Sequence, residues 1–433
     1  MMNKFALQIV LIVALWMCHF NGLNAQTTNS LSLKEAYLLL EKNYPNLQNS
    51  ELLNQIHQKE LEQLDIAKLP SIFLKADARL QSESVKLDAE GSTPLPFDIN
   101  QPLVSFKTYA EANYVVLDGG MNEAQRTLKE AQLKVNQQNI EVERYKLRER
   151  INQLFLTISL LREQSKVFDI SLKDLEARRT QIAAGVEYGV VLESELTKLQ
   201  VKEMELQSQQ NQLAFQLSGM IGTLATLTGM DLPDNIELVF PAMSKPLGIP
   251  SINRPEQEYL RLQRGLILAQ SDLITAARKP KLNAFAQTGF GYPNPLNMLD
   301  NNPAPFALIG AGFSWQITDW KKEKLDKSLL TLQAQQLQNQ QETFDFNLQS
   351  KEANYLANIQ RIYAQIEADE KIAGLQADIL QSLAVQLEEG VINTTEYILQ
   401  VNAELLARQQ LIVHQTELLQ TQLEFWNERG SLE

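Results

Sequence analysis

Apolar side chains recur every seven residues through the middle of this chain. After Gly119 and Gly120, residues 121–183 contain no proline and no glycine, which at ~1.5 Å per residue allows one helix of ~95 Å. A sustained seven-residue repeat of apolar positions is typical of a coiled coil. The repeating positions are Ile140, Leu147, Leu154, Leu161, Phe168, Leu175 and Ile182. Gly185 and Gly189 are expected to end this helix.

A second heptad series follows the break, at Leu192, Leu199, Leu206, Leu213, Met220 and Leu227. Because only a few residues separate the two series, they predict antiparallel neighbouring helices. The same arrangement occurs later, with an outgoing helix from about Asp319 to Glu389 that is interrupted only by Gly374. Its returning helix carries the series Val391, Ile398, Leu405, Ile412, Leu419 and Trp426. The chain is therefore expected to form two long helical hairpins.

Four segments upstream of these helices alternate apolar and polar residues with period two, which predicts strands. They are residues 71–81, 104–117, 281–290 and 306–317. Each is close to the ~9–11 residues of a strand that crosses an outer membrane. An ordinary sheet with one wet face has the same periodicity. If the strands do cross a membrane, four are too few to close a barrel, and open edges cannot face lipid. On that interpretation copies of the chain must pool their strands in a homo-oligomer.

The chain also matches itself when it is shifted by 201 residues, which indicates an internal duplication of a domain-sized element. Asp118 falls on Asp319, Glu195 on Glu396 and Gly229 on Gly430. The predicted organisation is a signal peptide over residues 1–25, a first repeat over 26–229, a linker over 230–252 and a second repeat over 253–430. Each repeat has a helix, two strands and a long helical hairpin, so the fold class is α+β.

The N-terminus has the pattern of a secretion signal, with Lys4 before an apolar run and Ala25 at the expected cleavage site. An uncleaved anchor is the alternative, although the apolar run is short for a membrane span. The one cysteine, Cys18, lies in this segment and follows Met17 rather than the small residue that lipid attachment normally requires. The net charge of −13 and the lack of a basic patch argue against nucleic acid as a partner.

The sequence carries no motif for catalysis or for a cofactor. It has no phosphate-binding Gly-x(4)-Gly-Lys-Ser/Thr segment, no Gly-x-Ser-x-Gly and no His-Glu-x-x-His. Beyond the signal segment only His57 and His414 remain, far apart in sequence, so no metal site is predicted. We expect no enzyme activity and no cofactor.

With this duplicated order of elements, the chain resembles the TolC-type outer-membrane efflux proteins. The resemblance covers nearly the whole mature chain and rests also on residues 117–120 (Leu-Asp-Gly-Gly) and on the Gly-x(5)-acid pattern at each hairpin turn. It implies an outer-membrane β-barrel of four strands per chain, pooled across a homotrimer and continuous with an antiparallel α-helical coiled-coil barrel in the periplasm. The implied function is a passive channel of a tripartite efflux or secretion system, working with a periplasmic adaptor and an inner-membrane transporter.

The resemblance also implies a site. The turns at Gly189-Val190 and Gly390-Val391 would be the periplasmic tips that dock the adaptor. In the family, acidic residues just beyond the second turn narrow the closed tip. Glu396 occupies the first such place, and Leu399 occupies the second, so the doubled carboxylate ring is incomplete. The tyrosine and arginine that lock the tip in some members are Leu387 and Ile392 in this chain.

The apolar positions of each heptad series form the buried seam of the coiled coil. Two seam positions of the first copy are polar in the second copy, and they extend the predicted gate. Asp369 and Gln376 stand where the first copy has Phe168 and Leu175, so we expect them on the inner wall with Glu396. Glu396 also has a simpler explanation, as a solvated residue at a helix start. Two other functions remain open, a periplasmic adaptor with one hairpin and soluble β modules, and a structural coiled-coil protein.

Overall fold

The computed structural model describes residues 30–83, 102–241, 252–297 and 299–430. Contacts divide the chain into two units, and each unit takes segments from both halves of the sequence. We call residues 46–143 with 254–348 the strand unit, and residues 1–45, 144–253 and 349–433 the helical unit. The predicted signal peptide with Cys18 lies outside the described residues, as does part of the 230–252 linker.

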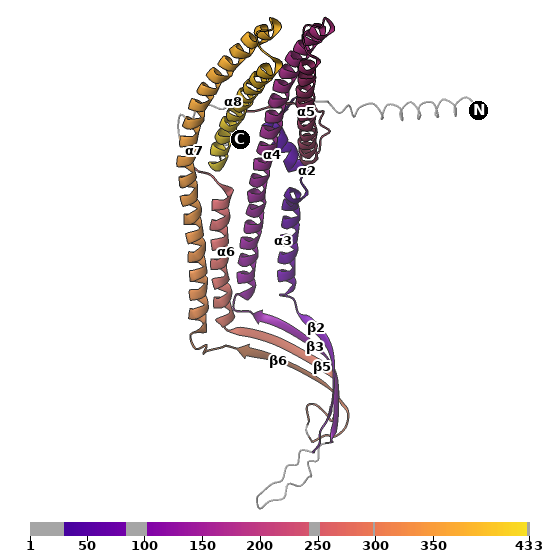
Figure 1. Ribbon diagram of the computed structural model, residues 1–433. Coiled ribbons are helices and arrows are strands. Elements are labelled where there is room, and N and C mark those ends of the chain that lie inside the picture. Colours follow the sequence, from indigo (N-terminus) through magenta and orange to yellow (C-terminus); the bar gives the residue numbers. More distant parts are fainter. Residues whose placement is uncertain (1–29, 84–101, 242–251, 298, 431–433) are drawn as a thin grey trace, which may run out of the picture. The chain divides into compact units, whose positions relative to one another are not determined.

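The strand unit contains one four-stranded antiparallel sheet in the order β2-β3-β5-β6 (Figure 1). Its strands are β2 (Ser71–Leu80), β3 (Val104–Leu117), β5 (Lys281–Tyr292) and β6 (Ala304–Ser314). In the observed register Ile72 pairs with Ala112, which pairs with Ala286, which pairs with Ile309. Because residues two apart share a face of a sheet, this register collects the apolar half of every alternating segment on one face. The four predicted strands are confirmed.

The last strand ends earlier than its alternation predicts. Residues 315 and 317 continue the apolar pattern, but β6 stops at Ser314, which pairs with Lys281. Lys281 is the first residue of β5 and follows Pro280, which has no N–H for a ladder bond. The partner strand therefore runs out, and the expected boundary at Ile317 is wrong by three residues.

Helices lead into and out of the sheet at one end of the strand unit. They are α3 (Asn49–Ile66), α6 (Pro255–Arg278) and the first parts of α4 (Met121–Glu187) and α7 (Lys322–Glu388). Polar contacts join α3 to α4, including an ion pair of 2.6 Å between Lys129 Nζ and Glu60 Oε1. Gln138 Nε2 also donates to the carbonyl oxygen of Pro255, which joins α4 to α6.

The helical unit contains the turns and the returning helices of both hairpins. Its elements include α2 (Leu33–Asn43), α5 (Glu193–Thr228) and α8 (Thr394–Glu428), of which α5 and α8 return from α4 and α7. The short 3-10 helix η1 (Pro45–Gln48) spans the point in the sequence where this unit gives way to the strand unit. A parallel pair of short strands, β1 (Ser30–Ser32) and β4 (Glu237–Val239), lies in the same unit. The two predicted hairpins are confirmed. No helix among the described residues combines the length and the apolarity that a membrane span requires.

Two predicted breaks are wrong. Gly374 lies inside α7, which is continuous from Lys322 to Glu388. Gly185 lies inside α4, which continues to Glu187, and only Gly189 interrupts the helical path. The carbonyl oxygen of Gly185 accepts the backbone N–H groups of Val190 and Val191 at 2.9 and 3.2 Å. A Cβ at this position would lie 2.7 Å from Val191 Cγ2. Gly185 therefore allows the chain to fold back closely over the last helical turn.

The heptad pattern predicts the buried side of α4 well and that of α5 only in part. All seven α4 seam positions given above are buried, whereas in α5 the buried face moves from Leu199 and Leu206 to Ile221 and Leu224. A straight helix has 3.6 residues per turn, so its buried stripe drifts from a strict seven-residue repeat. The expected series through Met220 and Leu227 is therefore displaced at the end of α5.

Candidate functional site

The two faces of the sheet differ sharply in chemistry. Paired positions on one face carry no charged side chain and include Ile72, Leu74, Ala76, Ala110, Ala112, Ala284, Ala286, Ala307, Ile309, Ala311 and Phe313. Ile309 is 86% exposed and Leu74 is 81% exposed, so nothing in the described chain covers this face. Such a face is suited to contact with hydrocarbon.

The opposite face holds a polar network that crosses three strands. Glu111 Oε1 accepts Lys75 Nζ at 2.8 Å, and Glu111 Oε2 accepts Gln287 Nε2 at 2.8 Å. Lys107 Nζ lies 4.1 Å and 4.6 Å from the ring centroids of Tyr109 and Phe306, within cation–π range. This face is suited to contact with water. The sheet therefore has the two-sided character of a wall between lipid and an aqueous interior.

Each outer strand of the sheet has only one neighbour among the described strands. β2 pairs with β3, and β6 pairs with β5, so the free edges of β2 and β6 expose unpaired backbone groups. Unpaired N–H and C=O groups are costly in hydrocarbon. The described chain alone therefore does not satisfy the backbone of a membrane wall.

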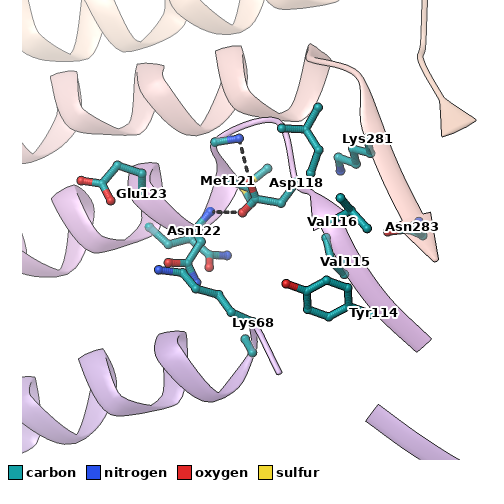
Figure 2. Close-up of a pocket in the computed structure, with 14 residues that line it drawn as sticks. Lys68, Tyr114, Val115, Val116, Asp118, Met121, Asn122, Glu123, Lys281 and Asn283 are labelled. Carbon is teal, nitrogen blue, oxygen red and sulfur yellow. Dashed lines mark hydrogen bonds between the residues drawn. The ribbon is translucent and has the colours of Figure 1, made fainter. Parts of the chain in front are cut away.

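A cleft of about 520 Å³ lies where the sheet meets the helices of the strand unit (Figure 2). Asp118 forms its turn, because its Oδ1 accepts the N–H of Gly120 at 2.8 Å and its Oδ2 accepts the N–H of Asn122 at 2.7 Å. Burial opposes ionisation of Asp118, but these backbone donors outweigh it and hold the pKa of the carboxyl below its usual range. Asp118 thus fixes the direction in which α4 leaves the sheet.

The predicted tips are tight turns with exposed apolar side chains. Gly189 and Gly390 have φ values of +73° and +68°, the left-handed region that glycine adopts without strain. The neighbouring Val190 and Val391 are 79% and 70% exposed. The turn geometry expected for both glycines is confirmed, while their role in docking stays a prediction.

The three predicted gate residues lie on the second hairpin but in different environments. Glu396 is exposed in the first turn of α8, where Asn393 Nδ2 donates to its Oε1 at 3.1 Å. Asp369 of α7 is half-buried and hydrogen-bonds to His414 of α8. Gln376 accepts Gln400 Nε2 at 2.6 Å through its side-chain oxygen. Asp369 and Gln376 thus connect the two helices of the hairpin, while Glu396 faces solvent.

Glu195, the match of Glu396 in the first copy, is used differently. Its Oε2 accepts the backbone N–H of Thr394 at 3.1 Å, and Lys198 Nζ lies 2.7 Å from its Oε1. The hydrogen bond from Lys198 lowers the pKa of Glu195, burial opposes that shift, and the bonds from Thr394 add to it. Glu195 therefore caps α8 of the other hairpin, whereas its match Glu396 is exposed to solvent.

The principal contact between the hairpins was missed by the sequence analysis. Tyr397 is fully buried and donates its hydroxyl to Asp174 Oδ2, while Arg178 pairs with Glu388. Burial, and then the contact with Asp174, raise the pKa of Tyr397, so the hydroxyl keeps its proton. A cavity of about 340 Å³ lies beside this network and is lined by charged side chains such as Arg408.

In α8 the heptad pattern predicted Ile398 as the buried residue, whereas the fully buried residue is its neighbour Tyr397. Ile398 belongs to the predicted seam and is partly buried, whereas Tyr397, one position earlier, has no exposed surface. Tyr397, Val401 and Leu405 are spaced by four and lie in one cluster with Leu175 and Leu199 of the first hairpin. A spacing of four is also helical, so this second apolar row of α8 was the available signal.

Comparison with known proteins places this architecture among solved structures. No protein-family model matches the chain, and a search of curated proteins finds no relative. The chain is similar to the outer-membrane channel OprN at 14% identity, over 92% of this chain and 90% of that chain, with a TM-score of 0.68. It is similar to the CmeC outer membrane channel of Campylobacter jejuni at 14% identity, over 92% and 85% of the two chains, with a TM-score of 0.66.

The outer membrane protein VceC of Vibrio cholerae is a third such structure, at 13% identity over 92% of this chain and 96% of that chain, with a TM-score of 0.65. At these identities the similarity shows the fold. The α+β arrangement expected from the sequence, with four strands and two long hairpins, is confirmed. This chain has the fold of the TolC-type outer-membrane channels.

Proposed function

We propose that this protein is the outer-membrane channel of a tripartite efflux or secretion system, a passive conduit that is not an enzyme. The observation that carries the proposal is the sheet with an uncharged, exposed face and a polar opposite face, joined in one chain to two long helical hairpins. The apolar face would contact outer-membrane lipid and the polar face would line the pore. The helices would then extend into the periplasm.

The free edges support an oligomer. In a ring of identical copies the edges are satisfied when β6 of one copy pairs with β2 of the next, and three copies would supply a 12-stranded barrel. Among the similar structures, OprN, CmeC and MtrE of Neisseria gonorrhoeae are outer-membrane channels. A homotrimer is therefore the favoured assembly.

The hairpin turns are proposed to dock a periplasmic adaptor that connects the channel to an inner-membrane transporter. Support comes from the exposed Val190 and Val391 beside Gly189 and Gly390, because exposed apolar side chains at a rigid turn are suited to contact with another protein. The transporter would supply the energy, since the channel carries no nucleotide-binding motif.

The gate is proposed to form around Glu396, with Asp369 and Gln376 further along the same hairpin. Glu396 is the exposed carboxylate of the three, so copies of it around an axis would form a ring of negative charge that favours cations. Asp369 and Gln376 lie ~32 and ~21 Å from the turn at ~1.5 Å per residue, where their bonds to α8 would set the width of the inner wall.

The two rival functions fit the fold less well. A periplasmic adaptor would need one hairpin and soluble β modules, whereas the described residues contain two hairpins and a sheet with an exposed apolar face. A structural coiled-coil protein would have no use for that face. The channel is also the only one of the three that uses the polar network and the free edges together.

Extraction and reconstitution test the channel. We expect the mature protein to need detergent for release from membranes, to migrate as an oligomer before heating and as a monomer after it, and to give stepwise conductance in planar bilayers. Cysteines at Val190 or Val391 should cross-link to the adaptor in cells, whereas cysteines in the barrel loops should not. A protein that stays monomeric in aqueous buffer after signal removal would refute the proposal.

A further inference from the structure

Trp320 has the most exposed of the large hydrophobic side chains in the described residues, at 92%. Its φ is +50°, and that of the next residue, Lys321, is +69°. This left-handed backbone is unfavourable for any residue with a Cβ. At the matched positions of the first copy, Gly119 and Gly120 adopt the same region without strain. The second copy therefore keeps the left-handed turn although it carries a tryptophan and a lysine there. This indicates that the two side chains make a contact that offsets the unfavourable backbone.

The first copy could not use a side chain there. A Cβ on Gly119 would lie 2.8 Å from the carbonyl oxygen of Ala276 and 2.9 Å from Lys279 Cβ at the end of α6. Trp320 follows the edge strand β6 and meets no such crowding. Its indole extends into a region that the described part of the same chain leaves empty.

Sheet topology identifies what a second copy would bring there. β2 and β6 run in opposite directions, so a β6–β2 pair between copies is antiparallel. That pairing places the end of β6, at Ser314, beside the start of β2, at Ser71, of the next copy. Trp320 lies six residues beyond that end, and Lys68 lies three residues before that start. Trp320 of one copy therefore approaches the α3–β2 junction of its neighbour.

The junction cleft opens at this place and suits the two side chains. Lys68 lies on its rim, and half-exposed apolar residues such as Tyr114 and Val116 form its wall (Figure 2). Its volume of about 520 Å³ admits an indole ring. Glu123 also lines the cleft, and neither Glu123 nor Lys321 has an ion-pair partner among the described residues.

We propose that Trp320 of each copy inserts into the junction cleft of the next copy, with Lys321 facing Glu123. The inference rests on the proposed oligomeric channel and adds to it a specific joint, because each cleft is completed by a residue of the adjacent copy. The joint would fix the angle between barrel and helices at every boundary between copies. The left-handed turn is retained because it directs the indole away from its own chain.

Paired cysteines test the contact in the full-length protein in membranes. The one natural cysteine, Cys18, lies in the predicted signal peptide, so in the mature protein only the introduced cysteines should react with the cross-linker. Trp320→Cys combined with Lys68→Cys should be linked between chains by a short bifunctional maleimide, giving covalent dimers and trimers. A link within one chain is disfavoured, because two strands separate β2 from β6 and neighbouring strands lie ~4.8 Å apart. Trp320→Cys with Lys59→Cys, a position inside helix α3 and further from β2 than Lys68, should not link.

Trp320→Gly gives an independent test, because a docked and an undocked indole predict opposite changes in the heat resistance of the oligomer. If the indole had no partner, glycine would only relieve the backbone and the oligomer would become more heat-resistant. If the indole is docked, we expect the detergent-solubilised Trp320→Gly oligomer to dissociate at a lower temperature than the natural protein. The protein concentration below which it dissociates should also rise by about tenfold or more. Trp320→Phe should fall between Trp320→Gly and the natural protein, because it keeps part of the aromatic contact.

The outcomes separate this inference from the proposed function. Ser71→Cys with Ser314→Cys reports closure of the barrel between copies. If that pair links but the Trp320–Lys68 pair does not, and nitroxide-labelled lipids quench the fluorescence that Trp320→Phe removes, then Trp320 faces lipid and the inference is wrong while the channel stands. If the protein is monomeric and neither pair links, the proposed channel fails and the joint fails with it.

Discussion

Replacing Tyr397 with phenylalanine removes one hydroxyl from the contact between the hairpins. Tyr397 has no exposed surface and donates to Asp174 Oδ2. A hydrogen bond to a charged group contributes about 1.5–3 kcal/mol, and its loss leaves a carboxylate without one of its donors. Arg178 stays near Asp174, with 3.8 Å between Arg178 Nε and Asp174 Oδ1, and compensates only in part.

This energy translates into a measurable population shift. Because each 1.4 kcal/mol is a factor of ten, Tyr397→Phe should shift the ratio of docked to undocked hairpins by roughly ten- to 150-fold. Tyr397→Ala should shift it further, since removing a buried aromatic ring costs about 3–5 kcal/mol through the cavity it leaves. Spin labels on cysteines at Val190 and Val391 report the change as a broader, longer distance distribution. Single-channel recordings should show more frequent open events.

Two variants control this experiment. Tyr188→Phe removes a hydroxyl from an 81% exposed tyrosine at the tip and should change neither readout. Asp174→Asn, alone and together with Tyr397→Phe, completes a double-mutant cycle in which the two changes should be strongly non-additive. If Tyr397→Phe behaves like Tyr188→Phe, or if the two changes are additive, the hydroxyl–carboxylate pair does not hold the hairpins together.

Three further predictions follow from the matched positions of the two copies. Glu396→Gln should lower cation preference and weaken block by multivalent cations in single-channel recordings, whereas Glu193→Gln, an exposed first-turn change on α5, should do neither. The pKa of Glu195 is lowered from its ordinary value of 4.5, so its stabilising contact is present above that value and is lost as pH falls through the lowered pKa. Melting temperatures measured from pH 7 to pH 3 should therefore fall more for the natural protein than for Glu195→Gln. Gly390→Ala should cost about 1–2 kcal/mol in thermal stability from the left-handed backbone alone, since nothing lies within 4 Å of its Cβ position, and Gly119→Ala should cost more because of Ala276.

The sequence predicted the elements because two simple periodicities dominate them. The alternation of apolar and polar residues predicted the bounds of β2 and β3 to within one residue. The absence of proline and glycine predicted the approximate length of α4. Errors occurred where a partner decides the boundary. β6 stops at Ser314 because β5 begins opposite it, and Gly185 stays helical because the turn packs back against it. Such boundaries depend on contacts that no local pattern contains.

The candidate site was less accessible to sequence reasoning because it depends on contacts between distant segments. Turn glycines are visible from sequence, since a left-handed residue between two helices favours glycine. The pairing of Tyr397 with Asp174 joins residues 223 positions apart, and neither residue belongs to a seven-residue series. The gate itself would form only between copies, so its carboxylate ring stays a prediction.

Comparing the two copies position by position shows which differences the fold needs. In two matched pairs, the residue of the first copy makes a contact that the fold needs, and the matching residue of the second copy is exposed. Glu195 caps α8 through the N–H of Thr394, and its match Glu396 is left exposed at the predicted gate. Gly119 is required by the close approach of α6, and its match Trp320 is exposed at the predicted joint between copies. Trp320 keeps the left-handed backbone of its match Gly119, so its exposed indole is not explained by folding of the single chain. We infer that contacts made in an assembled channel would explain both exposed side chains, which would place the predicted gate and the predicted joint in the same half of the chain.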